Sequence, residues 1–239
     1  MQTEPAIAGV EKYDDYYADG LQEEWRRICS SAKADNIVDL CSIVPHENIL
    51  EIGCGSGAIL EQLDQRGFGK SLCGIEISSS GIDQLNAKNL SSLHEARTFD
   101  GVEVPYGDKQ FDIAVLSHVV EHLEHPRSLL KEARRVAKHV FVEVPLEHTM
   151  RLKPDFDFNE VGHINFYTST TIRRLLQTSG LIVKRQIVTD TSKKMIVFQK
   201  GKKGVVQHLA RRTSLKLWPA LAQRIFVYHS ALLAASSIS

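Results

Sequence analysis

The sequence predicts an α/β protein built on a doubly wound, mostly parallel sheet of about seven strands with helices on both faces. Three observations lead to this prediction. Between residues 48 and 180, apolar strand-like runs alternate with amphipathic helical segments, the pattern of a parallel sheet covered by helices. A glycine-rich turn follows the first of these runs. Two further strand patterns, at 181–190 and 194–200, are joined by a short polar turn that permits only an antiparallel hairpin.

The predicted elements divide the chain into three parts, which are an N-terminal helical segment at 1–45, a core at 46–200 and a basic, amphipathic helical extension at 201–239. Apolar residues recur at helical spacing between 14 and 43, and Pro45 closes these helices. The core begins with strand patterns at 48–53, 71–77, 95–99, 111–117 and 139–145, of which 95–99 is weak. Helix patterns lie between and after these strands, at 58–67, 80–90, 126–137 and 170–180.

The composition is that of a globular protein with an unusual tail. Hydrophobic residues make up 43% and charged residues 24% of the 239 residues, enough to bury the core of one large domain, with or without an appendage. The formal net charge is zero, which gives no indication of nucleic-acid binding. Residues 201–239 hold six of the 29 basic residues and no acid, which leaves 23 basic against 29 acidic residues elsewhere. A basic C-terminal segment on an otherwise acidic chain indicates that this segment binds a partner.

The four cysteines form no CxxC pair, and Cys54 lies within the glycine-rich turn. This usage predicts reduced thiols rather than disulfide bonds or structural zinc. The N-terminus has neither the basic nor the apolar region of a signal peptide, and no run of about 18 apolar residues indicates a membrane span. We therefore expect a cytoplasmic protein.

The glycine-rich turn, IGCGSGA, places Gly53, Gly55 and Gly57 at the carboxyl end of the first strand, where doubly wound sheets bind ligands. A tight strand-to-helix turn alone would also need glycine. Glu76 ends the second strand about 20 residues further on, where an acid accepts both ribose hydroxyls of a nucleoside. Glu51 would repel the pyrophosphate of NAD, and the turn has no Arg or Lys to offset it. An acid there suits a ligand with an ammonium and a sulfonium group, which is S-adenosylmethionine.

From about Asn48 to Lys200 the chain resembles the class I S-adenosylmethionine-dependent methyltransferases, whose fold is Rossmann-like. LEIGCGSG looks like the first motif of that family and GIEIS like its second. FDGVEVPYGDKQFDIAVLSHVVEHLEHP looks like the third and fourth motifs, particularly in the small-molecule branch that includes the ubiquinone-type O-methyltransferases. The antiparallel hairpin predicted above also agrees with this fold.

The resemblance implies which residues bind the cofactor. They are Glu51, Gly53, Cys54, Gly55 and Gly57 around the methionine moiety, Glu76 at the ribose, Ile77 and Asp100 with Gly101 at the adenine, and Ser117 with His118 at the methionine end. The strand before Asp100 is polar, HEARTFDG, which departs from the family's usual third strand.

Residues 118–122 read HVVEH, the H-x-x-E-H spacing of one class of zinc peptidases. That site needs a third ligand on another helix and a long helix before His118. Here a strand, FDIAVLS, ends directly before His118, so we expect no metal site. Glu121 and His122 either stabilise a short helix after the fourth strand or take part in function.

Residues 146–168 form a long irregular connection, which we expect to cover the acceptor. Its polar and aromatic side chains suit a small organic acceptor or pack the loop onto the core; they are His148, His163, Asn165, Phe156, Phe158, Phe166 and Tyr167. His163 is the candidate general base. His118 is the alternative, and no base is needed if the acceptor is an amine or is already ionised.

These patterns predict methyl transfer from S-adenosylmethionine to a small-molecule or lipid-linked acceptor, at oxygen. Two alternatives stay open, an NAD-dependent oxidoreductase on the same fold and a non-catalytic nucleoside-binding partner protein. In the extension, Leu221, Ile225, Tyr228 and Leu232 fall on one helical stripe. This stripe either contacts an anionic membrane surface or packs on the protein's own sheet or on a second subunit of a homodimer.

Overall fold

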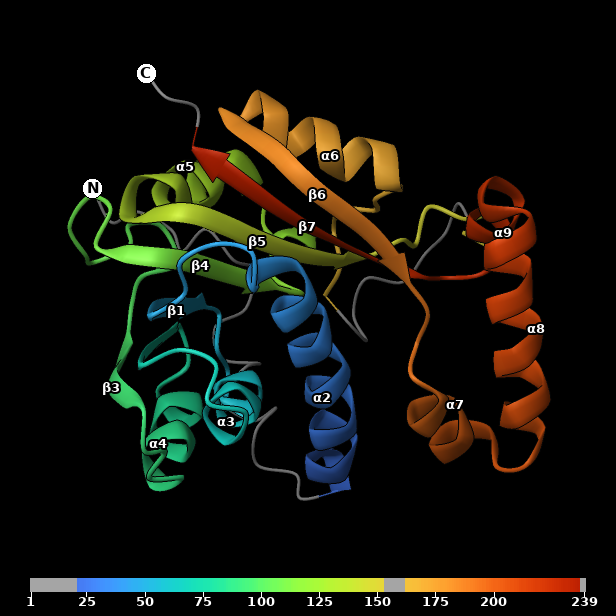
Figure 1. Cartoon of the computed structure of the whole chain (residues 1–239), viewed down its shortest axis with the longest axis horizontal. Coiled ribbons are helices and arrows are strands. Elements are labelled where there is room, and N and C mark those ends of the chain that lie inside the picture. The colour runs from blue at the N-terminus through green and yellow to red at the C-terminus, as the bar shows by residue number, and fades with distance from the viewer. Residues whose placement is uncertain (1–20, 153–161, 237–239) are drawn as a thin grey trace.

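Seven strands form one sheet in the order β3-β2-β1-β4-β5-β7-β6 (Figure 1). The computed structural model describes residues 21–152 and 162–236. Neighbouring strands from β3 to β5 run parallel, whereas β7 runs antiparallel to both β5 and β6. This arrangement confirms the predicted α/β class and the mostly parallel, Rossmann-like sheet. The strands are Asn48–Ile52 (β1), Ser71–Glu76 (β2), Leu93–Thr98 (β3), Phe111–Ser117 (β4), Ala137–Pro145 (β5), Leu181–Thr189 (β6) and His229–Ser236 (β7).

Helices cover both faces of the sheet. Helices α5 and α6 lie on one face, and α2, α3 and α4 lie on the other (Figure 1). Helices α7, α8 and α9 stand together at one end of the sheet (Figure 1). The bounds are Leu21–Cys41 (α2), Ala58–Gln65 (α3), Ser79–Ala87 (α4), Pro126–Val136 (α5), Ser169–Thr178 (α6), Lys193–Lys200 (α7), Lys203–Leu217 (α8) and Pro219–Ile225 (α9), with a 3-10 turn η1 at Val120–His122.

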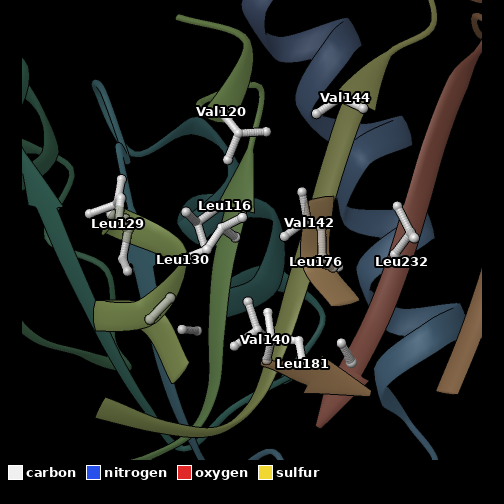
Figure 2. Close-up of a cluster of buried hydrophobic side chains, with 14 of the residues drawn as sticks. Leu116, Val120, Leu129, Leu130, Val140, Val142, Val144, Leu176, Leu181 and Leu232 are labelled. Atoms are coloured by element: carbon white, nitrogen blue, oxygen red, sulfur yellow. The ribbon is translucent and has the colours of Figure 1, made fainter. Parts of the chain in front are cut away.

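Strand β5 divides its side chains between the two faces. Val140, Val142 and Val144 belong to the cluster that contains the apolar side chains of α5 and α6 (Figure 2). Phe141, between them, belongs to the cluster on the opposite face with the side chains of α2 and α3. Because both faces of β5 are covered there, residues 140–145 are all buried, without alternation.

The predicted antiparallel hairpin is wrong in its second strand. Lys193–Lys200 forms α7 instead, and the Ser192 side chain caps this helix by accepting a hydrogen bond from the Met195 N–H. The antiparallel strand is β7, which comes from the predicted helical extension and lies between β5 and β6. Residues 230–234 of β7, SALLA, are all buried and do not alternate, so their pattern does not distinguish a strand from a helix.

The predicted stripe on the C-terminal extension is therefore not one helical face. Helix α9 ends at Ile225, while Tyr228 and Leu232 are fully buried in the core of the chain. The helical prediction for residues 201–239 holds for α8 and α9 and is wrong for β7.

Two other expectations change in detail. The helix predicted between 14 and 43 is α2, and residues 14–20 lie outside the described residues. Strand β3 is polar because it is the edge strand, where Glu95 and Arg97 form an ion pair of 3.4 Å. In the described part of the chain, no helix is long and apolar enough to cross a membrane.

Candidate active site

The chain turns sharply between β1 and α3, and two positions of this turn require glycine. Gly53 and Gly57 have φ angles of +75° and +74°, in the left-handed region that side chains disfavour. A Cβ atom at Gly53 would come 2.7 Å from Cγ2 of Val119, and one at Gly57 would come 2.2 Å from Cδ1 of Leu85. The turn therefore packs its backbone against neighbouring segments more closely than a side chain would allow.

Glu76, the last residue of β2, connects this turn to the sheet through hydrogen bonds. Its Oε2 accepts a hydrogen bond of 2.8 Å from the Gly55 N–H, and its Oε1 accepts from the N–H groups of Ile77 and Ser78. A carboxylate has about four acceptor positions, so capacity remains for a ligand hydroxyl. Burial raises the pKa of Glu76, although the three backbone hydrogen bonds oppose this.

Glu51 of β1 is a buried acid without a protein counter-charge in contact. Its side chain is 2% exposed, and its Oε2 has no hydrogen-bond partner among the described residues. Burial raises the pKa of Glu51 to about 8, and the nearby charge of Glu76 adds to this effect. A buried polar atom without a partner requires an explanation, and a cationic ligand would supply one.

Two histidines meet beyond the end of β4. His118 has a φ angle of +59°, which is rare for a residue with a side chain and marks a strained position. Its ring lies 5.2 Å from the ring of His229, the first residue of β7. Burial lowers the pKa of both histidines well below the usual value, so both rings are neutral. Ser117, directly before His118, is also buried, and its Oγ has no hydrogen-bond partner in the described chain.

The described end of the long loop, residues 162–168, is tied to η1 by backbone hydrogen bonds. The N–H groups of Ile164 and Asn165 both donate to the carbonyl oxygen of Glu121, over 2.9 and 3.0 Å. The Asn165 side chain adds a hydrogen bond of 2.7 Å to the Leu123 carbonyl. These bonds place His163 beside His122, with 4.7 Å between their ring centroids.

His163 is oriented by an acid from the other end of the same loop. Its Nδ1 lies 2.6 Å from Oε2 of Glu147, and only 7% of the residue is exposed. Burial by itself lowers the pKa of His163, but the hydrogen bond and the charge of Glu147 outweigh it and raise the pKa. Because a carboxylate only accepts hydrogen bonds, Nδ1 is the protonated nitrogen of the neutral ring, and Nε2 of that ring keeps a lone pair.

Glu121, His122 and His163 together offer three ligand atoms within 4.8 Å of one another, a set that could hold a divalent cation. The His122 Nδ1 donates to the Gly162 carbonyl over 3.0 Å, which likewise leaves its Nε2 with a lone pair. Glu121 is fully buried, and neither carboxylate oxygen has a hydrogen bond to a described residue. The zinc-peptidase pair of His118 and His122 does not form in this set, which contains His163 instead of His118. The His118 Nδ1 nevertheless lies 3.2 Å from Oε1 of Glu121.

Most of the predicted cofactor residues lie at the carboxyl ends of adjacent strands. Glu51 of β1 and the turn with Gly53, Cys54, Gly55 and Gly57 lie between Glu76 of β2 and Ser117 of β4. The Cys54 thiol is buried, which raises its pKa well above the usual value and keeps it protonated.

Asp100 and Gly101 lie one strand further out, beyond β3. Asp100 is exposed, and its Oδ1 already accepts from the N–H groups of Val102 and Glu103, over 2.8 and 2.9 Å. Its contact with adenine therefore stays a prediction.

Phe156 and Phe158 of the predicted covering loop lie outside the described residues.

Several charged groups around this site were not predicted from the sequence. Burial raises the pKa values of the acids Glu51, Glu121 and Glu143, and the charge of the Lys33 ammonium, on α2, opposes this increase. Glu143, in β5, is 3% exposed and accepts a hydrogen bond from the side chain of Asn36. The sequence signal for Glu143 was an acid between two valines of a predicted strand, whereas Lys33 gave no signal because it lies on an ordinary helix.

A family model for the methyltransferase domain matches residues 15–186. The chain belongs to this family. It contains a class I S-adenosylmethionine-dependent methyltransferase domain, as the sequence motifs predicted.

Similar proteins include the ajmaline N-methyltransferase of Rauvolfia serpentina, 28% identical over 108 residues, which are 44% of this chain and 37% of that protein. The mitochondrial ubiquinone biosynthesis O-methyltransferase of Candida albicans is 29% identical over 91 residues, which are 35% of this chain and 27% of that protein. The chain thus spans less than half the length of either. Geranyl diphosphate C-methyltransferase of Streptomyces coelicolor A3(2), solved with S-adenosylhomocysteine, superposes with a TM-score of 0.63 at 14% identity, covering 87% and 76% of the two chains.

The residues at the ends of β1 and β2 fit S-adenosylmethionine. The buried carboxylate of Glu51, whose Oε2 has no hydrogen-bond partner among the described residues, suits the ligand's ammonium group. Glu76 has acceptor capacity left for a ribose hydroxyl. The tight glycine turn lets backbone approach a ligand closely. No phosphate-binding Arg or Lys lies within the turn, which agrees with a cofactor that lacks phosphate.

Proposed function

We propose that this methyltransferase acts on a hydroxyl oxygen of a small-molecule or lipid-linked acceptor. The observation that carries the proposal is the pair formed by His163 and Glu147 in the loop after β5. A buried histidine held by a carboxylate is the arrangement that enzymes use to remove a proton from a hydroxyl group. An amine or an ionised acceptor would need no such pair.

When bound, S-adenosylmethionine supplies a methyl group on a positively charged sulfur, which an acceptor attacks in line. The residues of the chain would fix both reactants, since in-line transfer depends mainly on proximity and orientation. Glu51 would hold the ammonium end and Glu76 the ribose. Ile77, Asp100 and Gly101 would then contact the adenine.

His163 would remove the acceptor proton. A hydroxyl is a weak nucleophile until a base takes its proton. The Nε2 atom of His163 has the free lone pair for this step, and Glu147 would stabilise the imidazolium that forms. His118 is a poorer candidate for this base, because burial keeps its pKa well below the usual value. We assign His118 and Ser117 to the methionine end of the cofactor.

The similar proteins do not fix the acceptor atom, because their names include an N-methyltransferase, an O-methyltransferase and a C-methyltransferase. The choice of oxygen therefore depends on the histidine–carboxylate pair. The ubiquinone biosynthesis O-methyltransferase is one similar protein whose name supports methyl transfer to oxygen.

The test separates binding from turnover. The His163→Ala, His118→Ala and His148→Ala variants would be compared by calorimetry with S-adenosylhomocysteine and by transfer of a labelled methyl group to phenols, catechols and lipid-linked quinols. His148 is an exposed histidine of the same loop and serves as the matched control.

We expect His163→Ala to keep its affinity for S-adenosylhomocysteine and to lose turnover by about 100-fold or more. His118→Ala should lose affinity, and His148→Ala should change neither quantity. Full turnover of His163→Ala would reject the base assignment. Binding of S-adenosylhomocysteine by the wild type without transfer to any acceptor would favour the non-catalytic alternative.

A further inference from the structure

Helix α8 buries a charged side chain, Arg211, on its inner face and exposes several large apolar side chains on its outer face. Arg211 is 8% exposed and forms an ion pair of 2.6 Å with Asp190. The His208 ring lies 3.6 Å from the same carboxylate. The Tyr228 hydroxyl donates to the Arg211 carbonyl over 2.8 Å, and the guanidinium lies 4.9 Å from the Tyr228 ring. This polar anchor fixes which face of α8 points away from the protein.

The outward face of α8 and its continuation into α9 are apolar. We call the residues concerned the outer stripe; they are Val206 (71% exposed), Leu209 (65%), Leu217 (55%), Trp218 (62%) and Leu221 (53%). At about 100° per residue, the first three lie within about 80° of the helix circumference. A group of exposed large apolar side chains gathered on one helical face marks an interaction surface.

Positive charge surrounds the outer stripe. No Asp or Glu follows Asp190 in the sequence, whereas eight basic residues besides the buried Arg211 do. By helical position, Lys203 lies on one side of the stripe, and Arg212 and Lys216 lie on the other. An apolar strip between rows of basic side chains, with a tryptophan at its end, is the composition of a helix at an anionic lipid surface.

The stripe lies next to the acceptor end of the candidate active site. The Leu146 N–H donates to the Tyr228 carbonyl over 2.7 Å, and the Met150 N–H donates to the Arg224 carbonyl over 2.8 Å. These two bonds join the loop that contains Glu147 to the end of α9 and the segment after it. Met150 itself is highly exposed. Figure 1 shows α8 and α9 standing at one end of the sheet, free on their outer side.

We propose that the outer stripe docks on the surface of an anionic phospholipid bilayer, with its apolar side chains at headgroup level and its lysines and arginines on the phosphates. A symmetric dimer through this face would bring two basic rows together, which like charges disfavour. Docking would present the loop with Glu147 and His163 to the membrane. In that respect the inference rests on the proposed function, because it specifies a lipid-linked acceptor.

The experiment is sedimentation with vesicles of phosphatidylcholine alone and of phosphatidylcholine mixed with phosphatidylglycerol. Two variants test the two parts of the surface: a triple variant Val206→Ser, Leu209→Ser, Leu217→Ser, and a double variant Lys203→Glu, Lys216→Glu. All five positions are exposed, so the fold should tolerate the changes. The matched controls are Ile43→Ser and Lys131→Glu, which alter exposed residues elsewhere.

We expect the wild type to bind the anionic vesicles and to be released by salt. Each test variant should lose binding by about tenfold or more, while both controls bind as the wild type does. S-adenosylhomocysteine affinity and transfer to a soluble acceptor should be unchanged in both test variants, which separates docking from the proposed function. Absence of vesicle binding by the wild type would overturn the proposal. The proposal would also be overturned if the wild type were a dimer and the triple variant a monomer, because the stripe would then be a subunit interface.

Discussion

Replacing Glu51 with glutamine should abolish the pH dependence of cofactor binding between pH 6 and pH 7. Glu51 is almost fully buried, and burial raises its pKa to about 8. In the free protein at neutral pH, its carboxyl group is therefore mostly protonated. A bound ammonium group favours the carboxylate, so binding must expel the proton. Affinity should rise with pH as this proton becomes easier to remove.

The magnitude follows from the pKa. With a value of about 8, about 0.9 of the molecules carry the Glu51 proton at pH 7, so binding should release about 0.9 protons per ligand. Affinity should fall about tenfold from pH 7 to pH 6, which corresponds to about 1.4 kcal/mol. An α-amino group has a pKa of about 8 and remains charged over this range, so the ligand itself adds little.

The assay is calorimetry of S-adenosylhomocysteine binding at both pH values, in two buffers with different enthalpies of ionisation. The wild type should show the tenfold change and the proton release. Glu51→Gln should bind more weakly, by roughly 1–3 kcal/mol at pH 7, with neither effect. Glu103→Gln, which alters an exposed acid, is the matched control. A flat wild-type profile, or the same slope in Glu51→Gln, would refute this account of Glu51.

Three further predictions concern other parts of the chain. Glu147→Gln should lower the midpoint of the His163 ring titration in NMR spectra, because Glu147 raises that pKa; an unchanged midpoint would mean the two do not interact in solution. If His163 acts as a base without a metal, chelator-treated protein should keep its turnover. Elemental analysis that finds one zinc per chain, lost in a His122→Ala His163→Ala variant, would make these residues and Glu121 ligands instead. Leu232→Ala should cost about 2–5 kcal/mol in denaturant unfolding, since Leu232 is fully buried in a central strand, and a loss below about 1 kcal/mol would contradict the position of β7.

The cofactor end of the site could be predicted because its signals are local in sequence. Glu51, the glycine turn and Glu76 lie within 26 residues, and the alternation of strands and helices places them together at one edge of the sheet. The acceptor end combines residues that are far apart. Glu147 joins His163 across a long loop, and the charge of Lys33 acts on the buried acids from α2, so no spacing rule could predict either interaction.

The last strand could not be placed from sequence for a similar reason. A strand covered on both faces loses the alternation that identifies strands, and β7 contains mainly alanine and leucine, which suit a helix equally well. The segment 194–200 was apolar enough to imitate a strand, but the Ser192 cap starts a helix there. Tertiary packing, which the sequence pattern does not contain, decided both cases.

The most direct test of the central claim is a comparison of S-adenosylhomocysteine and NAD binding to the wild type and to Glu76→Ala by calorimetry. The account predicts one S-adenosylhomocysteine per chain and at most weak binding of NAD. Glu76→Ala should weaken S-adenosylhomocysteine binding by about 1–3 kcal/mol, because Glu76 both fastens the glycine turn and accepts from the ribose. Tight binding of NAD with no response to S-adenosylhomocysteine would contradict the account.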